Sequence, residues 1–473
     1  MSEGKAGEDK NKAVRRDLAL REWLQRLDAT DRLSVAREGT NLLHELAAIA
    51  NLCDGKRATV FPHPSGHKGS VISGLLSRRG WMAEALGISE TELLPTFVDA
   101  CQNPVAPRRV DKGACQEIVY EGDAVDLAGI LPIPTHNEHD SGAYISAGLL
   151  ICRNPRTGVQ NVAIHRLQVS GPREMGVLLL PRHTLSFFQA AEAAGEDLDI
   201  AVVIGADPAA LLASQAIVPI DFDEMGVAGA LAGAPIEVVK CLGSEVLVPA
   251  NAEIIIEGRL LARTLAPEGP FGEFPQYYGP RADRHVIAVD RITHRPDPLF
   301  HTIVGGGLEH LLLGGIPREA SILTSLRRNF PNVRDVHLSH GGICRYHLHV
   351  QIEPGQPGGA KNIIMGAFAA HYDIKHVTVV DTDVNIHDAE MVEWAVATRF
   401  QADRDMVMIP GSQGSKLDPS TDGGLGCKTG FDATIPAGSE PFTFKRISVP
   451  GQEEIDLAAV LEPGRRLADL AGA

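Results

Sequence analysis

The sequence lacks the short motifs that mark the common cofactor, phosphate and nucleophile sites. It has no GxGxxG after a strand, no GxxxxGK phosphate loop followed by Ser or Thr, no GxSxG elbow and no HExxH helix. These patterns would supply a dinucleotide site, a triphosphate site, a serine nucleophile and a catalytic zinc, respectively. The glycine triplet at 305–307 has only the first half of either glycine-rich pattern. Serine-triad and zinc-protease chemistry are therefore disfavoured.

Paired cysteines and long apolar runs are also missing. The seven cysteines are odd in number and contain no Cys-x-x-Cys pair, which argues against a disulfide framework and for a reducing compartment. The N-terminus is highly charged and has no apolar core, unlike a secretory signal. No run approaches the length of a transmembrane helix. The sequence predicts a cytoplasmic protein with no membrane partner.

Positive charge is scarce relative to negative charge. The 44 basic and 60 acidic residues give a net charge of −16, so the chain lacks the electrostatic footprint of a nucleic-acid or anionic-membrane binder. An anionic substrate would need local cations or a metal ion to overcome this field.

The chain is long and rich in glycine, and the spacing of its apolar residues changes along its length. A chain of 473 residues with 48 glycines favours two or three α/β domains over a helical bundle. Helical periodicity dominates from Arg16 to Ala50, short β-rich runs follow from about 107, and strands alternate with helices from about 345, as in a βαβ layer. The predicted fold class is α/β, and α+β in part. The predicted parts are a disordered lead (1–15), an N-terminal helical and α/β region (16–105), a β-rich domain (106–310), an α/β domain (311–450) and a C-terminal helix or tail (451–473).

Two glutamates, Glu268 and Glu273, stand in a segment at 266–274 that is punctuated by glycine and proline. These residues disfavour a helix or a regular strand, so we expect a rigid loop that aims both carboxylates, flanked by Phe271 and Phe274. Two neighbouring carboxylates in an apolar setting do not both ionise freely, and one then holds a proton, as a general acid must. The alternative is an ordinary surface turn with two solvated acids.

The β-type run at 161–169 contains an arginine among apolar residues. With ideal alternation Arg166 shares a face with Val162 and Ile164, and a buried arginine requires a carboxylate. Glu268 or Glu273 would provide it; the alternative is an edge-strand arginine in solvent.

Three scattered residues could bind a hard or borderline divalent cation. Asn161, His183 and Glu237 offer an amide oxygen, an imidazole and a carboxylate, a set suited to Mn²⁺ or Mg²⁺. Their spacing forms no metal motif. Glu237 could equally be a solvated strand residue, and His183 a helix cap. Lys428 could contact a phosphate or be merely solvated.

These segments together resemble the UbiD family of (de)carboxylases that depend on prenylated flavin mononucleotide (FMN). The resemblance spans roughly 105–440. It is carried by NVAIHRLQV (161–169), PIEVVKC, LVPANAEIIIEG (247–258), APEGPFGEF (266–274), VVDTDVNIHD with WAVATR (379–399), and KTGFDAT (428–434). It implies a central split β-barrel that binds the flavin and a C-terminal βαβ oligomerisation domain.

The resemblance also implies roles for individual residues. Arg166, Glu268 and Glu273 match the catalytic network, with Glu273 as the proton donor. The matching metal ligands are Asn161, His183 and Glu237, with Mn²⁺ in many members and K⁺ nearby. The matching cofactor contacts are Asn161, Ala163, Ile164, Arg166, Gln168, His183 and Lys428, although Ala163 occupies a position that is often a hydroxyl or glycine. A flavin prenyltransferase would supply the cofactor.

The segment 301–323, which the resemblance places beside the pocket, indicates the class of substrate. His310 and Arg318, eight residues apart, are similar to the pattern in members that act on five-membered heteroaromatic acids, such as furan dicarboxylate and pyrrole-2-carboxylate. The expected function is reversible, non-oxidative decarboxylation of such an acid by a homodimer or homohexamer. Alternatives are the same reaction on phenolic or polyprenylated 4-hydroxybenzoates, or a non-catalytic assembly subunit. Arg318 could instead be a solvated residue in the first helical turn after Pro317.

Overall fold

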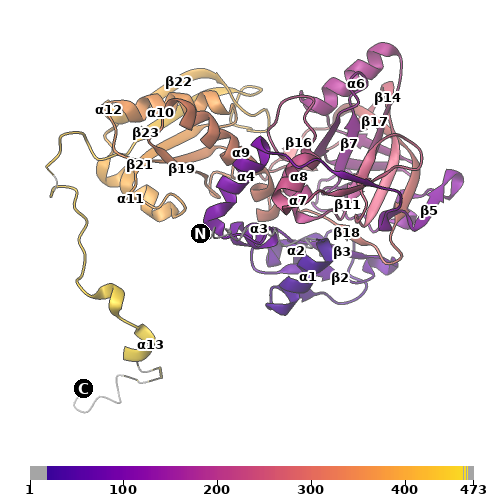
Figure 1. Ribbon diagram of the computed structural model, residues 1–473, viewed down its shortest axis with the longest axis horizontal. Helices are drawn as coiled ribbons and strands as arrows, with labels where there is room; N and C mark the ends of the chain where they lie inside the picture. Colours follow the sequence, from indigo (N-terminus) through magenta and orange to yellow (C-terminus); the bar gives the residue numbers. More distant parts are fainter. Residues whose placement is uncertain (1–18, 441, 462, 465, 467–473) are drawn as a thin grey trace, which may run out of the picture.

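The computed structural model describes residues 19–440, 442–461, 463–464 and 466, and it shows a mixed α/β protein built on several sheets (Figure 1). The predicted disordered lead, residues 1–15, lies outside the described residues. An N-terminal layer, a large central sheet and a C-terminal sheet follow one another along the chain. The final segment, which contains α13 (Leu457–Val460), runs away from the C-terminal sheet.

The N-terminal layer packs helices on a small sheet of order β1-β2-β3-β18. Helix α1 buries Leu20, Trp23, Leu24 and Leu27, whose spacing places them on one helical face. The expected helical stretch to Ala50 is interrupted, because β1 pairs in parallel with β2. The elements are α1 (Leu20–Ala29), β1 (Leu33–Val35), α2 (Glu45–Cys53), β2 (Ala58–Phe61), β3 (Ser70–Ser73), α3 (Arg79–Ala85) and α4 (Leu93–Gln102).

The central domain is a nine-stranded sheet of order β6-β9-β10-β17-β14-β11-β7-β8, with β5 paired to β17. Its strands are β5 (Ile118–Glu121), β6 (Tyr144–Ile145), β7 (Leu149–Arg153), β8 (Gln160–Ile164), β9 (Leu167–Gly171), β10 (Glu174–Val177), β11 (Leu198–Ile204), β14 (Ile254–Glu268) and β17 (Ala282–His294). Smaller sheets flank it, formed by β4 (Arg108–Val110), β12 (Glu237–Lys240) and β13 (Leu247–Pro249), and by β15 (Phe271–Gly272) and β16 (Tyr278–Gly279).

The two ends of the central sheet meet at one seam. Strand β8 lies at one end of the hydrogen-bonded order and β9 next to the other end. Only two residues separate the strands, so Ile164 and Leu167 can be no more than ~11 Å apart along the chain. The sheet must therefore curl into a barrel that is split between β8 and β9, and Arg166 stands at the split.

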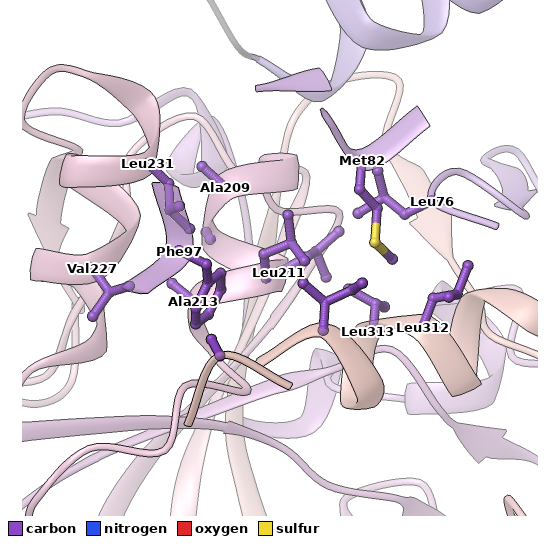
Figure 2. Close-up of a cluster of buried hydrophobic side chains, with 14 of the residues drawn as sticks. Leu76, Met82, Phe97, Ala209, Leu211, Ala213, Val227, Leu231, Leu312 and Leu313 are labelled. Atoms are coloured by element: carbon purple, nitrogen blue, oxygen red, sulfur yellow. The ribbon is translucent and has the colours of Figure 1, made fainter. Parts of the chain in front are cut away.

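Helices join the central sheet to its neighbours through a shared apolar core. Figure 2 shows buried side chains from α3, α4, α7 (Pro208–Ala213), α8 (Glu224–Ala232) and α9 (Leu308–Asn329) meeting in one cluster. The labelled members are Leu76, Met82, Phe97, Ala209, Leu211, Ala213, Val227, Leu231, Leu312 and Leu313. Helix α6 (His183–Ala194) matches the predicted helix near 185–194. Strand β18 (Leu299–His301) belongs to the N-terminal sheet, and the short α5 (Leu127–Ile130) contacts β9 of the central sheet.

The C-terminal sheet has the order β19-β20-β21-β23-β22. The predicted strand and helix alternation is present, with parallel pairing of β20 to β21 and of β21 to β23, and antiparallel outer strands. Its elements are β19 (Val333–Leu338), β20 (His347–Ile352), α10 (Gly359–Ala370), β21 (His376–Asp381), α11 (Ala389–Arg399), α12 (Ala402–Asp405), β22 (Met406–Gln413) and β23 (Leu425–Asp432). In the described part of the predicted C-terminal helix, α13 has only four residues.

Within the described residues, no helix is both long and apolar enough to cross a bilayer.

Candidate active site

Arg166 lies between the two glutamates that the sequence singled out. Its Nη2 donates to Oε2 of Glu268 at 2.7 Å, and its Nη1 donates to Oε1 of Glu273. The exposed fractions of the three side chains are 8% for Arg166, 0% for Glu268 and 12% for Glu273. The prediction that Arg166 is buried against a carboxylate is confirmed, and the solvated alternatives for all three residues are wrong.

The backbone that presents these groups differs from the expected single loop. Glu268 is the last residue of β14 and pairs with Ala282 of β17, whereas Glu273 follows β15 directly. Strand β14 pairs with β11 only as far as Leu260, so beyond that residue one of its two edges has no ladder partner. Pro267, which has no N–H to donate, is therefore tolerated in this part of β14. The two acids therefore come from a strand end and a short loop.

The environments of the two glutamates are unequal. Burial raises the pKa of Glu273, although the charge and hydrogen bond of Arg166 oppose the shift. Glu268 accepts a further hydrogen bond of 3.0 Å at Oε1, from the Tyr144 hydroxyl. The ring of Phe271 lies 5.5 Å from the guanidinium carbon of Arg166 and 4.3 Å from the ring of Tyr144, which shields the group from water. Glu273 is thus the acid better suited to hold a proton.

Gln168 fastens the strand that follows Arg166 to the loop between the two acids. Its Oε1 accepts from the backbone N–H of Gly269 at 2.9 Å and lies 3.1 Å from the Tyr144 oxygen, whose one proton goes to Glu268. Its Nε2 donates to the Ser141 carbonyl at 3.0 Å. Sequence reasoning missed Tyr144, because a tyrosine in an ordinary β-rich run gives no local signal of its partners. The two other strand residues predicted to contact the cofactor, Ala163 and Ile164, are half-buried in β8.

A second polar group forms where β8 meets α6 and α8. Asn161 Nδ2 donates to Thr184 Oγ1 at 3.0 Å, which leaves the amide oxygen available as a ligand. Next to Thr184 in the chain, His183 places its Nδ1 3.9 Å from Oε1 of Glu224. The other oxygen of Glu224 accepts from the Val162 N–H at 2.8 Å. Asn161, His183 and Glu224 therefore form one group.

Glu237, the carboxylate predicted for this group, is elsewhere. It begins β12 and pairs with Arg108 of the neighbouring strand β4, with 38% of its side chain exposed. Glu237 stands at the partly exposed start of β12, and Val238 and Val239 after it are buried, so the solvated-strand interpretation fits its position. In the structure Glu224, not Glu237, is the carboxylate beside Asn161 and His183. The signal for Glu224 in the sequence is weak, because an acid after Asp223 resembles an ordinary helix start.

The corrected group fits a divalent cation. Burial raises the pKa of Glu224 to about 8, so its negative charge is poorly compensated by the protein alone. An amide oxygen, an imidazole and a carboxylate are ligands that Mn²⁺ or Mg²⁺ accepts, with water or phosphate oxygens completing the shell. No group of three His, Cys, Asp or Glu suited to a metal occurs in the described part of the chain, so an amide ligand is needed for this site.

The remaining predicted residues lie on the wall formed by α9 and the C-terminal sheet. Lys428 is buried in β23 and donates to the carbonyls of Tyr372 and Ile374, so the solvated alternative is wrong. Arg318 lies inside α9, which continues through Pro317, so it does not belong to a first helical turn. His310 stands two turns earlier, and its ring meets the edge of Phe274 at 6.4 Å.

A cleft of about 300 Å³ opens beside the loop that follows Glu273. Pro275 and Tyr277 line it from the loop after Glu273, and Ile343 and Tyr346 line it from the C-terminal domain. The ring of Phe274 contacts Tyr346 at 5.8 Å, so the cleft and the glutamate loop share a wall.

Comparison with known proteins places the site in a family. The sequence profile of the UbiD family, described as 3-octaprenyl-4-hydroxybenzoate carboxy-lyase, matches an N-terminal domain at 24–101, a Rift-related domain at 108–308 and a C-terminal domain at 311–433. A curated relative is the anhydromevalonate phosphate decarboxylase of Methanothermobacter thermautotrophicus, 42% identical over 80% of this chain and 88% of the relative. The enzyme of the same name from Methanosarcina mazei is 37% identical over 92% of this chain and 100% of the relative.

Solved structures agree with this assignment. The UbiD-class enzyme HmfF from Pelotomaculum thermopropionicum, in complex with FMN, has a TM-score of 0.92 and 46% identity over 93% of this chain and 100% of that chain. The 3,4-dihydroxybenzoic acid decarboxylase of Enterobacter cloacae has a TM-score of 0.87 and 30% identity over 93% and 98% of the respective chains. An evolved dimeric HmfF was solved with prenylated FMN. The chain, with its arginine held between two buried glutamates at the split of a barrel, belongs to the UbiD family of carboxy-lyases.

Proposed function

We propose that this protein catalyses the reversible, non-oxidative decarboxylation of a small heteroaromatic carboxylic acid with prenylated FMN. The observation that carries the proposal is the shared guanidinium of Arg166, which holds Glu268 and Glu273 in unequal surroundings. A non-catalytic assembly subunit would have no need to bury these charges together, since burying an ion network costs free energy unless function retains it.

The chain's own residues divide the work. Arg166 orients the substrate carboxylate beside the cofactor and holds Glu268 in place through a charge-assisted hydrogen bond. Tyr144 fixes Glu268 from its other oxygen. Glu273 keeps a proton because it is desolvated, and it delivers that proton to the substrate carbon after CO₂ has left. In the carboxylation direction the same carboxylate removes the proton.

The cofactor supplies the electron sink that loss of CO₂ from an aromatic carbon requires. Asn161, His183 and Glu224 would hold a divalent metal, Mn²⁺ or Mg²⁺, against its phosphate, and K⁺ would bind nearby. Asn161, Ala163, Ile164, Arg166, Gln168, His183 and Lys428 are the proposed cofactor contacts. The similar HmfF enzyme was solved in complex with FMN, which supports a flavin here. A flavin prenyltransferase would provide the prenylated form.

The substrate assignment has one competitor. His310 and Arg318 on α9 are similar to the pattern in family members that act on five-membered heteroaromatic acids, which supports a heteroaromatic acid, such as a furan, pyrrole or indole carboxylate. The curated relatives are named for a phosphate-bearing substrate, which makes a phosphorylated, non-aromatic acid the second candidate. Phenolic or polyprenylated benzoates are the third. Because this chain is similar to a 3,4-dihydroxybenzoic acid decarboxylase, the substrate panel includes phenolic acids.

The decisive experiment is a substrate panel on protein co-produced with a flavin prenyltransferase. We expect a flavin absorbance spectrum and CO₂ release from a heteroaromatic acid. Glu273→Gln should retain the spectrum and lose at least about 100-fold in turnover, because a positioned general acid contributes at least that much. Glu138→Gln is the matched control, since Glu138 is an exposed acid in the same domain. Protein without bound flavin, or Glu273→Gln with full turnover, would refute the proposal.

We further propose that the chain forms a homodimer or homohexamer through its C-terminal domain. Light scattering of the purified protein would measure the assembly, and a monomer would contradict the proposal.

A further inference from the structure

A short turn at 137–141, just before β6, lies against the backbone that carries Glu273. The turn is closed by its own hydrogen bonds. The N–H of Asp140 donates to the Asn137 carbonyl at 3.1 Å, and Oδ2 of Asp140 accepts from the N–H and from Nδ2 of Asn137 at 2.9 and 3.0 Å. One carboxylate oxygen is therefore used within the turn, and Oδ1 is left to bind outside it.

The turn holds the loop between the two acids at three points. Oδ1 of Asp140 accepts from the backbone N–H of Gly272 at 2.8 Å, one residue before the proposed proton donor. The N–H of Ser141 donates to the Pro270 carbonyl at 3.0 Å, and its Oγ donates to the Gly269 carbonyl. Two neighbouring residues of the turn thus satisfy the backbone of most of this loop.

The turn is also in close contact with both strands of the ribbon formed by β15 and β16. A Cβ on Gly272 would lie 2.4 Å from Nδ2 of Asn137, and the three atoms nearest to that Cβ all belong to the Asn137 side chain. Gly272 pairs with Tyr278, whose hydroxyl accepts from the N–H of His139 at 3.3 Å. The rings of His139 and Tyr278 lie 5.2 Å apart. A change in the turn would therefore be felt across the ribbon.

The same segment reaches the other acid. Tyr144, a few residues after the turn, donates to Glu268 at 3.0 Å. The positions of Glu268 and Glu273 are thus coupled through one short stretch of chain, residues 137–144.

We propose that Asp140 is a positioning residue for the reaction, which holds the N–H of Gly272 and so fixes Glu273 beside Arg166. This inference rests on the proposed role of Glu273 as proton donor. A carboxylate binds a backbone N–H more strongly than a neutral acceptor does, and small misplacements of a catalytic group lower the rate sharply. Asp140 acts through Glu273 rather than on the substrate.

The charge of Asp140 acts in the same sense as its hydrogen bond. Burial raises the pKa of Glu273, Arg166 opposes that shift, and the charges of Glu268 and Asp140 add to it. A raised pKa keeps Glu273 protonated to higher pH, as a proton donor requires. Removing the charge of Asp140 should therefore lower the pKa of Glu273.

Hydrogen–deuterium exchange of the cofactor-loaded protein tests the contact without turnover. In Asp140→Ala the amides of residues 269–277 should exchange at least about 10-fold faster than in wild type, because the Gly272 N–H loses a charged acceptor and the ribbon opens more often. Asp140→Asn, which keeps one oxygen, should show intermediate exchange. Glu138→Gln changes an exposed acid of the same turn and should exchange like wild type. Exchange in Asp140→Ala equal to that of wild type would refute the contact.

The kinetic test separates positioning from packing. Asp140→Ala should lower kcat at least about 10-fold with a smaller change in KM, since Arg166 still binds the substrate carboxylate. Decarboxylation requires protonated Glu273, so kcat should fall as pH rises through its pKa. That fall should begin at lower pH in Asp140→Asn than in wild type or Glu138→Gln. A loss of the same size at every pH would show that Asp140 serves only in packing, and faster exchange with unchanged kcat would also overturn the proposal.

This inference and the proposed function fail in different ways. Full turnover in Glu273→Gln would refute the role of Glu273. Lost turnover in that variant, together with unchanged exchange and kcat in Asp140→Ala, would refute the inference on Asp140 alone. If no acid of the panel is turned over, the proposed substrates are refuted, and the exchange measurement decides whether Asp140 holds the ribbon.

Discussion

The Tyr144 hydroxyl donates to the Glu268 oxygen that Arg166 leaves free, at 3.0 Å. Glu268 is thereby held from both oxygens with no exposure to solvent. Burial and the adjacent carboxylate raise the pKa of Tyr144, so the phenol remains a donor throughout the accessible pH range. Glu268 is thus held in one position by two donors, while burial raises the pKa of its neighbour Glu273.

Replacing Tyr144 by phenylalanine tests this division. The change leaves one lone pair of a buried carboxylate without a donor, which costs about 1–3 kcal/mol. We expect the free energy of unfolding, measured by urea denaturation, to decrease by an amount in that range. We expect kcat, measured by CO₂ release, to fall about 10-fold or more. Unchanged kcat would show that Glu268 needs no second donor.

Gly279 offers a variant that should separate activity from stability. A Cβ at this position would lie 2.9 Å from Nη1 of Arg166, the nitrogen that contacts Glu273. Because the guanidinium can move aside, Gly279→Ala should cost less than about 1 kcal/mol of stability. Displacement of the guanidinium should still lower kcat/KM about 100-fold, since small misplacements of catalytic groups cost this much. A loss of stability without loss of activity would contradict this prediction.

Glu224 and Glu237 form a matched pair for the metal site. Glu224→Gln should reduce Mn²⁺ affinity at least about 10-fold, because a charged ligand is removed from the shell. Glu237→Gln makes the same chemical change at a residue that pairs with Arg108 at the surface, and it should leave metal content unchanged. Metal analysis of both purified variants measures the difference. Metal loss from Glu237→Gln alone would restore the original assignment.

Buried histidines should make the protein sensitive to acid. Burial lowers the pKa of His136 to about 4 and, together with nearby positive charge, those of His310 and His371 to about 3. Their folded-state values lie below the unfolded value of about 6.5, so the stability they confer is complete above that pH and is lost as pH falls towards 4. At pH 5 each of these histidines lowers the free energy of unfolding by about 2 kcal/mol relative to pH 7. The urea midpoint should therefore drop over this interval.

His136→Gln should reduce the fall in unfolding free energy between pH 7 and 5 by about 2 kcal/mol. His63→Gln, which changes an exposed histidine, is the control and should leave the pH dependence intact. An identical pH dependence in wild type and His136→Gln would show that the pKa of His136 is the same in the folded and unfolded states.

The sequence predicted the parts of the site that obey local rules. Arg166 among apolar residues demanded a carboxylate, and two acids among glycine, proline and phenylalanine indicated coupled groups. The alternation of strands and helices after 345 appears as predicted, because each apolar period is local to its element. Strand β1 was missed, since three residues carry too little pattern to be distinguished from a helix–helix connection.

Contacts between distant elements could not be predicted in this way. Glu224 reaches Asn161 and His183 because α8 packs against β8, a placement decided by tertiary structure. Glu237 lies in a more conspicuous apolar run, so the sequence pattern favoured it as the carboxylate of the metal site. The continuation of α9 through Pro317 was also hidden, because a proline usually marks a helix start, whereas here tertiary packing of both halves outweighs the lost hydrogen bond.

Helix α9 has a consequence for how the family can diversify. Its first turn is tied to the N-terminal layer, where Glu309 accepts from the backbone N–H groups of Gly74 and Leu76, and Glu319 farther along contacts Arg79 and His337. His310 and Arg318 lie between these anchors. Adding one residue would rotate every later side chain by about 100° and break the far anchor. Side chains between the two anchors can therefore be exchanged without disturbing either one, whereas the length of the helix cannot be changed.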